Sequence, residues 1–372
     1  MTTVADIVRD YGPEYLDRFG KDLLPSHRKA LRNIAECHTP AMGGHRFLCA
    51  DCGKDHFQYH SCRNRSCTSC QSADREKWIQ ARLRDLLPCR YFHLVFTVPE
   101  ELNRIIRSHQ KDLLGVLMRS TGAALQILAA DPKHLGGNIG VLEVLHTWGS
   151  NLEYHPHVHC LVPGGALRRS FGAWTSSRKK FFLSVRALSR LFRGRFLAMV
   201  RKQCPDLEIP QSVYDRDWVV FCKQAVQGPK KVLEYLGRYI HRTAISDGRI
   251  IRVANGLVTF TYKDYRTGSK KEMTLPAMEF LRRFLQHVLP TGFRKVRYLG
   301  LFSPSCRAEF RSLQLALWNR SGRSFPDLPP RLPKQLICHH CGSLNVSLIG
   351  LSLPNERPPP QITTISPDRG AR

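Results

Sequence analysis

The sequence predicts an α+β protein in which a central antiparallel sheet with packed helices follows a small cysteine-rich module. Two observations support this class: strand-like and helix-like segments succeed one another from residue 89 onward, and six of the thirteen cysteines lie between Cys37 and Cys70. Strands joined by short connections are usually antiparallel neighbours. We expect a helical and zinc-binding domain over 1–88, the sheet domain over 89–300, a basic region with a Cys-x-x-Cys pair over 301–350 and a disordered tail over 351–372.

The composition favours a soluble protein that binds a polyanion. The chain has 57 Lys and Arg against 30 Asp and Glu, a formal charge of +27, and the basic residues are spread along nearly its whole length. Nucleic acid is the simplest partner for such a charge. No segment is expected to cross a membrane, and the amino end has no apolar core of signal-peptide length. We therefore expect a cytoplasmic, nucleoid-associated protein.

The clustered cysteines predict metal binding, because disulfides are rare in a reducing compartment. Two Cys-x-x-Cys pairs are separated by fourteen residues, and two such pairs can close a tetrahedral zinc site. We predict one structural Zn²⁺ held by Cys49, Cys52, Cys67 and Cys70. The surplus ligands, enough for a second ion, are Cys37, His45, Cys62, His38 and His60. Near the C-terminus, Cys338 and Cys341 form a lone pair that Cys306, His339 or His340 would have to complete.

The remaining elements follow from periodicity and from start and stop signals. Residues 72–88 form an amphipathic helix that ends at Pro88 and closes the zinc module. Strand-like 91–99 precedes helical 100–131, and strands follow at 139–149 and 157–165. Residues 168–215 are interpreted as an insertion that contains a basic helix, after which 217–224 resumes the sheet. Pro229 opens a further helix over 228–246.

A hairpin is predicted beyond Ser246, because Asn255-Gly256 is a strong two-residue turn signal. Its arms place cations beside aromatic residues, including Tyr262 and Tyr265. This pattern suits single-stranded nucleic acid, which binds through base stacking and phosphate contacts, and an edge hairpin with a solvated face explains it equally well. Residues 278–300 predict a helix and then a basic strand or loop.

Three histidines stand at alternate positions in "YHPHVHCLVPGG", namely His155, His157 and His159. On a strand, His157 and His159 would share one face, where two imidazoles suit a metal ion. Surface or hydrogen-bonded core histidines would give the same pattern. His146 on the preceding strand is the first candidate for a third ligand, with His155 and Gln224 as alternatives.

Two tyrosines in "EYLGRYIHR", Tyr235 and Tyr239, are four residues apart and therefore one turn apart on one face of a helix. The helix also carries the cations Lys230, Lys231, Arg238 and Arg242. Half-buried aromatic residues with a solvated basic face would account for the helix taken alone.

Taken together, these motifs resemble the HUH-superfamily transposases of rolling-circle insertion sequences, the insertion-sequence ninety-one type. The similarity rests on His157-Val158-His159, the downstream Tyr-x-x-x-Tyr helix and the upstream cysteine module, and extends from about Cys37 to about Cys341 in the family's order. Two positions depart from the family pattern. Ser66 stands where a histidine usually precedes the last Cys-x-x-Cys, and "CHHCG" replaces the usual Cys-Pro-x-Cys-Gly.

The resemblance implies an HUH nuclease domain that cleaves and rejoins single-stranded DNA at element ends and target. Tyr235 and Tyr239 would form a 5′-phosphotyrosine, and His157, His159 and His146 would hold Mg²⁺ or Mn²⁺. The cations of the tyrosine helix would bind the DNA backbone. The sequence has no phosphate-binding motif of a helicase motor, so unwinding would come from elsewhere, such as a host helicase.

Two other classes of protein share part of the pattern. A rolling-circle replication initiator or relaxase-type nickase would share the histidine strand and the tyrosine. A non-enzymatic zinc-dependent DNA-binding protein would share only the cysteines and the charge.

Overall fold

The computed structural model describes residues 2–168, 172–178, 181–224, 237, 240, 243–264, 267–322 and 336–355, without the side chains of 72–77 and 80. These residues form two compact units. The sheet unit consists of the described residues of Ser72–Leu328 with Thr2, and the cysteine unit joins Thr3–Gln71 to the described residues of Pro329–Arg372. The C-terminal Cys-x-x-Cys pair therefore folds with the N-terminal module, whereas the sequence predicted a separate region over 301–350.

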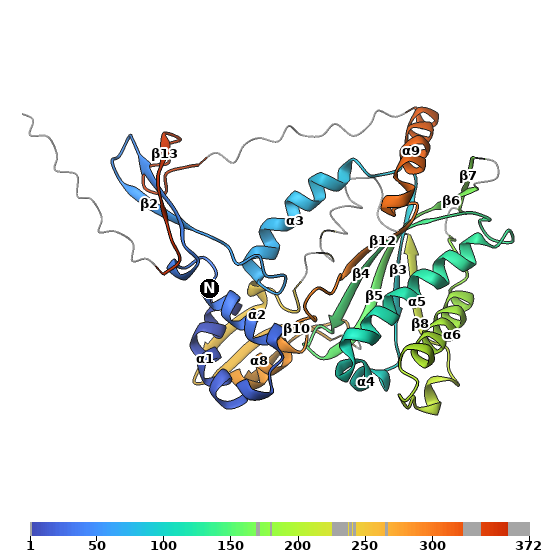
Figure 1. The fold of residues 1–372 in the computed structure, drawn as a ribbon, viewed down its shortest axis with the longest axis horizontal. Helices are drawn as coiled ribbons and strands as arrows, with labels where there is room; N and C mark the ends of the chain where they lie inside the picture. Colours follow the sequence, from blue (N-terminus) through green and yellow to red (C-terminus); the bar gives the residue numbers. More distant parts are fainter. Residues whose placement is uncertain are drawn as a thin grey trace, which may run out of the picture. The chain divides into compact units, whose positions relative to one another are not determined.

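The sheet unit is built on a five-stranded sheet of order β12-β4-β5-β3-β8, in which every neighbouring pair is antiparallel (Figure 1). The strands are β3 (Tyr91–Thr97), β4 (Gly140–Trp148), β5 (Tyr154–Pro163), β8 (Val219–Gln224) and β12 (Val296–Gly300). The α+β class with a central antiparallel sheet is confirmed. Strands β3, β4, β5 and β8 lie at segments predicted to be strands, and β12 lies where a basic strand or loop was predicted.

Helices α4 (Leu102–Ser108), α5 (Gln110–Ala130) and α6 (Val185–Gln203) pack on one face of this sheet, the helical face (Figure 1). Alternation along the strands turns Val158, Cys160 and Val162 of β5 into this core. Phe192 and Phe196 of α6 are fully buried in the same core. Since α6 supplies part of the main core, the region interpreted as an insertion is integral to the fold.

The length and composition of helix α5 contradict the expectation that no segment could cross a membrane. By length and composition it could do so, but 72% of its most apolar window is buried inside the protein. A helix between a sheet and a second helix needs an apolar surface on most sides. The position of α5 in the core accounts for its composition.

Several smaller elements complete the sheet unit. Strands β6 (Gly165–Arg168) and β7 (Ala173–Ser176) form a hairpin. A second sheet of order β11-β10-β9 contains β9 (Ile250–Ala254), β10 (Leu257–Lys263) and β11 (Lys270–Pro276), and the helices α8 (Ala277–Leu285) and α9 (Arg307–Ser321) follow. The predicted turn between β9 and β10 has φ of 52° at Asn255 and 73° at Gly256, which a type I′ turn requires.

The cysteine unit contains α1 (Val4–Phe19), α2 (Pro25–Glu36) and a three-stranded antiparallel sheet of order β13-β1-β2. Its strands are β1 (Gly44–Cys49), β2 (Asp55–Tyr59) and β13 (Val346–Ser352). Strand β13, from the far end of the sequence, pairs along the whole of β1. Helix α3 (Thr68–Leu83) begins in this unit and continues into the sheet unit.

Candidate functional site

Four histidines gather on the face of the central sheet opposite to α5 and α6, which we call the histidine face. His157 and His159 lie on β5, and His146 of β4 is directly opposite His157. His93 of β3 points to the same face, because it alternates with the core residues Phe92 and Leu94. One ring nitrogen each from His146, His157 and His159 lies within 4.8 Å of the others.

The hydrogen bonds of His157 determine which of its nitrogens faces the group. Its Nδ1 is 2.7 Å from the carbonyl oxygen of His155, and a carbonyl only accepts, so Nδ1 carries the proton. In the neutral ring, Nε2 therefore presents a lone pair, and it lies 3.1 Å from Nε2 of His159. Two nitrogens approach this closely when a proton or a cation lies between them. The geometry thus suits a cation ligated by imidazole.

His93 was not singled out from the sequence, and it contacts the group directly. Its Nε2 is 2.9 Å from Nδ1 of His159, and the two rings are stacked with an interplanar angle of 9°. Burial lowers the pKa of His93 to about 4, so its ring is neutral near pH 7 and can accept a hydrogen bond. The sequence signal for His93 was a histidine inside the otherwise apolar segment "YFHLVF". It stands at a position that alternates with the core residues Phe92 and Leu94.

The other two candidates for a third ligand lie outside this group of nitrogens. His155 is next to His157, with ring centroids 5.3 Å apart, and burial lowers its pKa. Gln224 pairs with Phe92, so the sheet alternation assigns it to the helical face. His146, in contrast, stacks on Trp148 with ring centroids 4.5 Å apart and joins the group.

The predicted tyrosine helix lies largely outside the described residues. Tyr235, Tyr239, Lys230, Lys231, Arg238 and Arg242 are all in this category. The structure does describe Gly237 and Ile240, which are both helical and buried. Ile240 belongs to the buried hydrophobic cluster that also contains Leu142, Val144 and Leu161 of the histidine face. One residue of the tyrosine segment therefore shares a hydrophobic cluster with the face on which the histidines gather.

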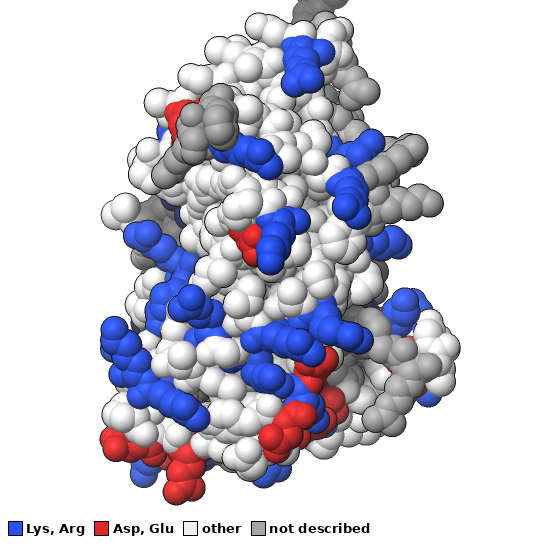
Figure 2. Space-filling view, turned by 90° about the vertical axis from the view of Figure 1, so that its right-hand side faces the viewer, with Lys and Arg blue, Asp and Glu red and all other residues white. Residues whose placement is uncertain are grey.

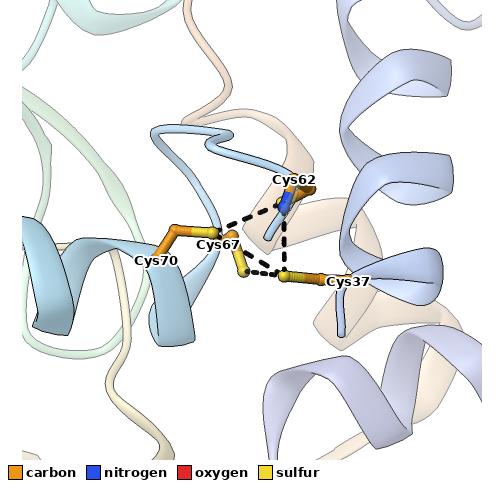
Figure 3. Close-up of side chains that lie close together, drawn as sticks. All are labelled: Cys37, Cys62, Cys67 and Cys70. Carbon is orange, nitrogen blue, oxygen red and sulfur yellow. Dashed lines mark hydrogen bonds between the residues drawn. The ribbon is translucent and has the colours of Figure 1, made fainter. Parts of the chain in front are cut away.

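The cysteines form two groups of four, which differ from the predicted grouping. The first group contains Cys37 after α2, Cys62 after β2, and Cys67 and Cys70 at the start of α3 (Figure 3). Sγ distances within it are 3.6 Å for Cys37–Cys70, 3.6 Å for Cys62–Cys70 and 3.7 Å for Cys37–Cys67. A hydrogen bond with Cys62 lowers the pKa of Cys67 to about 5, so one thiolate forms readily in this group.

The second group joins Cys49 and Cys52 to the C-terminal pair, Cys338 and Cys341. Its Sγ distances include 3.6 Å for Cys49–Cys341 and 3.7 Å for Cys52–Cys338. Each pair is followed by a glycine with positive φ, 66° at Gly53 and 74° at Gly342, whose N–H donates to the carbonyl of the first cysteine of the pair. The two halves are therefore matching turns, with the shared sequence Cys-x-x-Cys-Gly.

Both groups fit Zn²⁺ in number, ligand type and spacing, because four sulfurs at 2.3 Å around a tetrahedral ion lie about 3.8 Å apart. The prediction that Cys49, Cys52, Cys67 and Cys70 share one ion is wrong for this geometry, since the two pairs belong to different groups. His45, proposed as a ligand, contacts His60 instead, with ring centroids 4.8 Å apart. His38 bonds the carbonyl of Tyr59, and Cys306, His339 and His340 belong to neither group.

Comparisons with known sequences show that the chain is similar to transposases. The family model described as "Transposase zinc-binding domain" matches residues 7–98, and the one described as "Putative transposase" matches residues 140–309. A relative from Sinorhizobium fredii, "Putative transposase y4qJ", is 42% identical over 325 residues, which are 82% of this chain and 81% of the relative. The "Transposase for insertion sequence element IS801" of Pseudomonas savastanoi pv. phaseolicola is 30% identical over 291 residues, 74% and 70% of the two chains.

The chain belongs to the IS91 family of transposases. The zinc-binding match of the transposase covers the whole first cysteine group and half of the second, whereas Cys338 and Cys341 lie beyond residue 98. Among solved structures, the conjugative relaxase TrwC in complex with oriT DNA matches 63% of this chain and 72% of its own, at 11% identity. Its TM-score of 0.25 is too low to indicate a shared fold.

Proposed function

We propose that this transposase cleaves and rejoins single-stranded DNA at a divalent cation held by His157, His159 and His146. The observation that carries the proposal is the convergence of one nitrogen from each of these residues, two on β5 and one directly opposite on β4. A surface or core histidine would need only one hydrogen-bond partner. Three nitrogens that face one another need a shared cation or proton.

Mg²⁺ or Mn²⁺ suits the reaction, because a divalent ion in an open site polarises the scissile phosphate and neutralises charge that develops on it. His157, His159 and His146 would hold the ion, and oxygen ligands from DNA and water would complete its coordination. His93 and the carbonyl of His155 orient the two ligand rings of β5 through their Nδ1 atoms. Such outer hydrogen bonds fix the tautomer of a ligating histidine.

Tyr235 and Tyr239 are the proposed nucleophiles, and the place of Ile240 in the same hydrophobic cluster as Leu142, Val144 and Leu161 of the histidine face supports this role. The hydroxyl oxygen attacks the phosphorus, the bond to the 3′ oxygen breaks, and the tyrosine proton leaves as the 3′ oxygen gains one. The products are a 5′-phosphotyrosine and a free 3′-hydroxyl, which can attack the phosphotyrosine in turn and rejoin a strand. Bond energy is conserved, so the exchange needs no nucleotide cofactor.

The charge of the chain supports a DNA substrate. Lys and Arg outnumber Asp and Glu on the side of the molecule that includes α6 (Figure 2). The exposed cations of α6 are Arg186, Arg190, Arg195, Arg201 and Lys202; their helix lies on the helical face, so they add to the overall positive charge and are not proposed as contacts near the histidines. We propose the tyrosine-helix cations Lys230, Lys231, Arg238 and Arg242 as the contacts next to the scissile phosphate. Rolling-circle transposition would then use these contacts at both the element ends and the target, with strands opened by a host helicase.

The test is a covalent-adduct assay with 5′-labelled and 3′-labelled single-stranded DNA that carries the ends of the element, in Mg²⁺ or Mn²⁺. Wild-type protein should form a denaturation-resistant complex with the labelled 3′ fragment. His157→Ala should abolish the adduct and keep most DNA affinity, because the ion acts mainly on the transition state. The matched control is His134→Ala, which removes a histidine outside the group and should leave the adduct unchanged.

Variants of the two tyrosines test which residue is the nucleophile. Tyr235→Phe and Tyr239→Phe should each lower adduct formation or transfer to a second strand, and the double variant should form none. An adduct that persists in the double variant would remove both residues and direct attention to Tyr262 or Tyr265. Cleavage without transfer to a target strand would favour a replication initiator or nickase, and DNA binding with neither would favour a non-enzymatic zinc protein.

A further inference from the structure

The histidine face continues into an apolar cavity that the proposed reaction leaves unused. The cavity has a volume of about 310 Å³ and lies within the sheet unit. Leu142 of β4 and Leu161 of β5 form part of its lining and are direct partners in the sheet. Its other walls come from α3, the start of β3, β12 with the segment after it, and the start of α9. They are rich in aromatic residues: Trp78, Tyr91, Tyr298, Phe302 and Phe310.

The cavity and the histidine group are adjacent on the same strands. Along β5, Leu161 follows His159 by two residues and so lies on the same face, about 7 Å further along the strand. Along β4, Leu142 and His146 are four residues apart on this face. His93 is directly opposite Leu161 and bonds to His159, so it lies between the cavity and the group. A polymer bound at the histidines could reach the cavity with its next units.

Two arginines and Asp85 line the cavity, so the charged side chains of its wall sum to a positive charge. Arg82 lies over the ring of Tyr298, 5.9 Å from its centroid, and pairs with Asp85 at 3.1 Å. The Nε of Arg82 is buried and has no hydrogen-bond acceptor among the described residues. Arg307, the first residue of α9, also lines the cavity. The site therefore combines aromatic surfaces with hydrogen-bond donors and positive charge.

We propose that this cavity binds an unstacked nucleobase of single-stranded DNA, from a nucleotide close to the scissile phosphate. The inference rests on the proposed function for the position of that phosphate. Aromatic faces accept any base by stacking, and arginines beside them bind the adjoining phosphate or the edge of the base. A cavity of this size with a few polar groups has the dimensions of a small-molecule site. An anionic, aromatic ligand fits its lining better than an apolar peptide would.

The experiment compares binding of two probes of equal charge in EDTA, so that no cleavage occurs. One probe is a fluorescein-labelled 20-nucleotide oligothymidylate, and the other is a 20-unit abasic strand with the same phosphate backbone. Tyr298→Leu keeps apolar volume and removes the ring. It should weaken oligothymidylate binding by about 10-fold, as expected for one lost stacked base, and leave abasic-strand binding unchanged. Tyr298→Phe keeps the ring and should bind both probes like the wild type.

A matched control is available on the helical face of the sheet, where Arg201 lies 5.5 Å from the ring centroid of Tyr214. Tyr214→Leu removes a similar tyrosine paired with an arginine and should leave binding of both probes unchanged. Equal losses for both probes in Tyr298→Leu, or no loss for either, would overturn the nucleobase assignment. That result leaves the proposed cleavage reaction standing, whereas failure of the wild type to bind either probe would overturn both.

A second measurement avoids substitution altogether, in case Tyr298→Leu does not fold. Wild-type protein is irradiated with an oligothymidylate in which 5-iodouracil replaces single thymines, and the crosslinked residues are identified by mass spectrometry. Crosslinks at Trp78, Tyr298, Phe302 or Phe310 are the expected result. Crosslinks confined to other parts of the chain would show that bases bind elsewhere and would overturn the assignment.

Discussion

Nε2 of His93 lies 2.9 Å from Nδ1 of His159, on a strand next to the one that carries the histidine pair. Burial lowers the pKa of His93 to about 4, which keeps its ring neutral and able to accept. In the tautomer in which Nε2 of His93 accepts, His159 donates from Nδ1 and its Nε2 presents a lone pair toward Nε2 of His157. The orientation of a proposed metal ligand thus depends on a residue outside the ligand set.

His93→Ala should weaken metal binding by about 10- to 100-fold, because an outer partner holds the tautomer and angle of a ligating histidine. The measurement is the Mn²⁺ dissociation constant from electron paramagnetic resonance, with adduct formation followed over a range of Mn²⁺ concentrations. Adduct formation should recover largely at saturating Mn²⁺, which a merely unfolded variant would not do. His93→Asn, whose amide oxygen can accept, should recover part of the affinity. An unchanged Mn²⁺ dissociation constant in His93→Ala would exclude the positioning role.

The two cysteine groups predict two Zn²⁺ ions per chain, where the sequence predicted one with ligands to spare. Cys67→Ser and Cys341→Ser should each lower the zinc content measured by elemental analysis from two ions to one. Zinc binding supplies about 10 kcal/mol or more of folding free energy to small domains, so each variant should also become sensitive to proteolysis in the cysteine unit. Cys204→Ser changes a cysteine outside both groups and is the control. A single ion in wild-type protein would contradict the two-site arrangement.

The sheet and the histidine group could be predicted from sequence because each depends on local signals. Alternation assigned His157 and His159 to one face, and the short connection between β4 and β5 made antiparallel pairing of His146 with His157 the simplest arrangement. The turn at Asn255-Gly256 was predictable for the same reason, since two left-handed residues determine it. In each case, the residues that decide the structure are close together in the sequence.

The pairing of cysteine turns could not be derived from spacing alone, because ligands of one ion need not be near one another in the chain. Cys49 and Cys341 are 292 residues apart, and nothing local connects them. A sequence signal nevertheless existed. Cys49/Cys52 and Cys338/Cys341 both precede a glycine, whereas Cys70 precedes Gln71 within a helix. The glycine marks the turn geometry of a zinc knuckle and distinguishes the two kinds of pair.

DNA affinity should fall steeply with salt, because a net charge of +27 implies many phosphate contacts. Each phosphate neutralised on a single strand contributes roughly −0.7 to the slope of log affinity against log salt. The measurement is fluorescence anisotropy of a labelled oligothymidylate at several NaCl concentrations. If the guanidinium of Arg82 binds one phosphate of the strand, Arg82→Gln should make the slope less steep by roughly 0.7. A slope near zero in the wild type would show that the basic surplus has another role.

The last prediction concerns Glu143, which faces α5 from the helical face of the sheet and is fully buried. Neither carboxyl oxygen has a hydrogen-bond partner among the described residues. Burial raises the pKa of Glu143 to about 8, against the smaller opposing effect of Arg297. The folded protein therefore holds a proton that the unfolded chain releases at about pH 4.5. This contribution to stability is complete below that pH and is lost as pH rises toward 8.

Glu143→Gln removes the titrating group and keeps its size, so the variant should lose less stability than the wild type between pH 6 and pH 9. The difference over this window is about 3 kcal/mol, because one unit of pKa corresponds to about 1.4 kcal/mol and about two units of the shift from 4.5 to about 8 lie above pH 6. Thermal unfolding at each pH, with Glu272→Gln on exposed β11 as the control, measures it. The pH slopes are compared and not the absolute stabilities, because the buried amide in Glu143→Gln would also lack hydrogen-bond partners, which changes stability independently of pH. Parallel slopes for Glu143→Gln and wild type would mean that Glu143 titrates near its ordinary pKa in the folded protein.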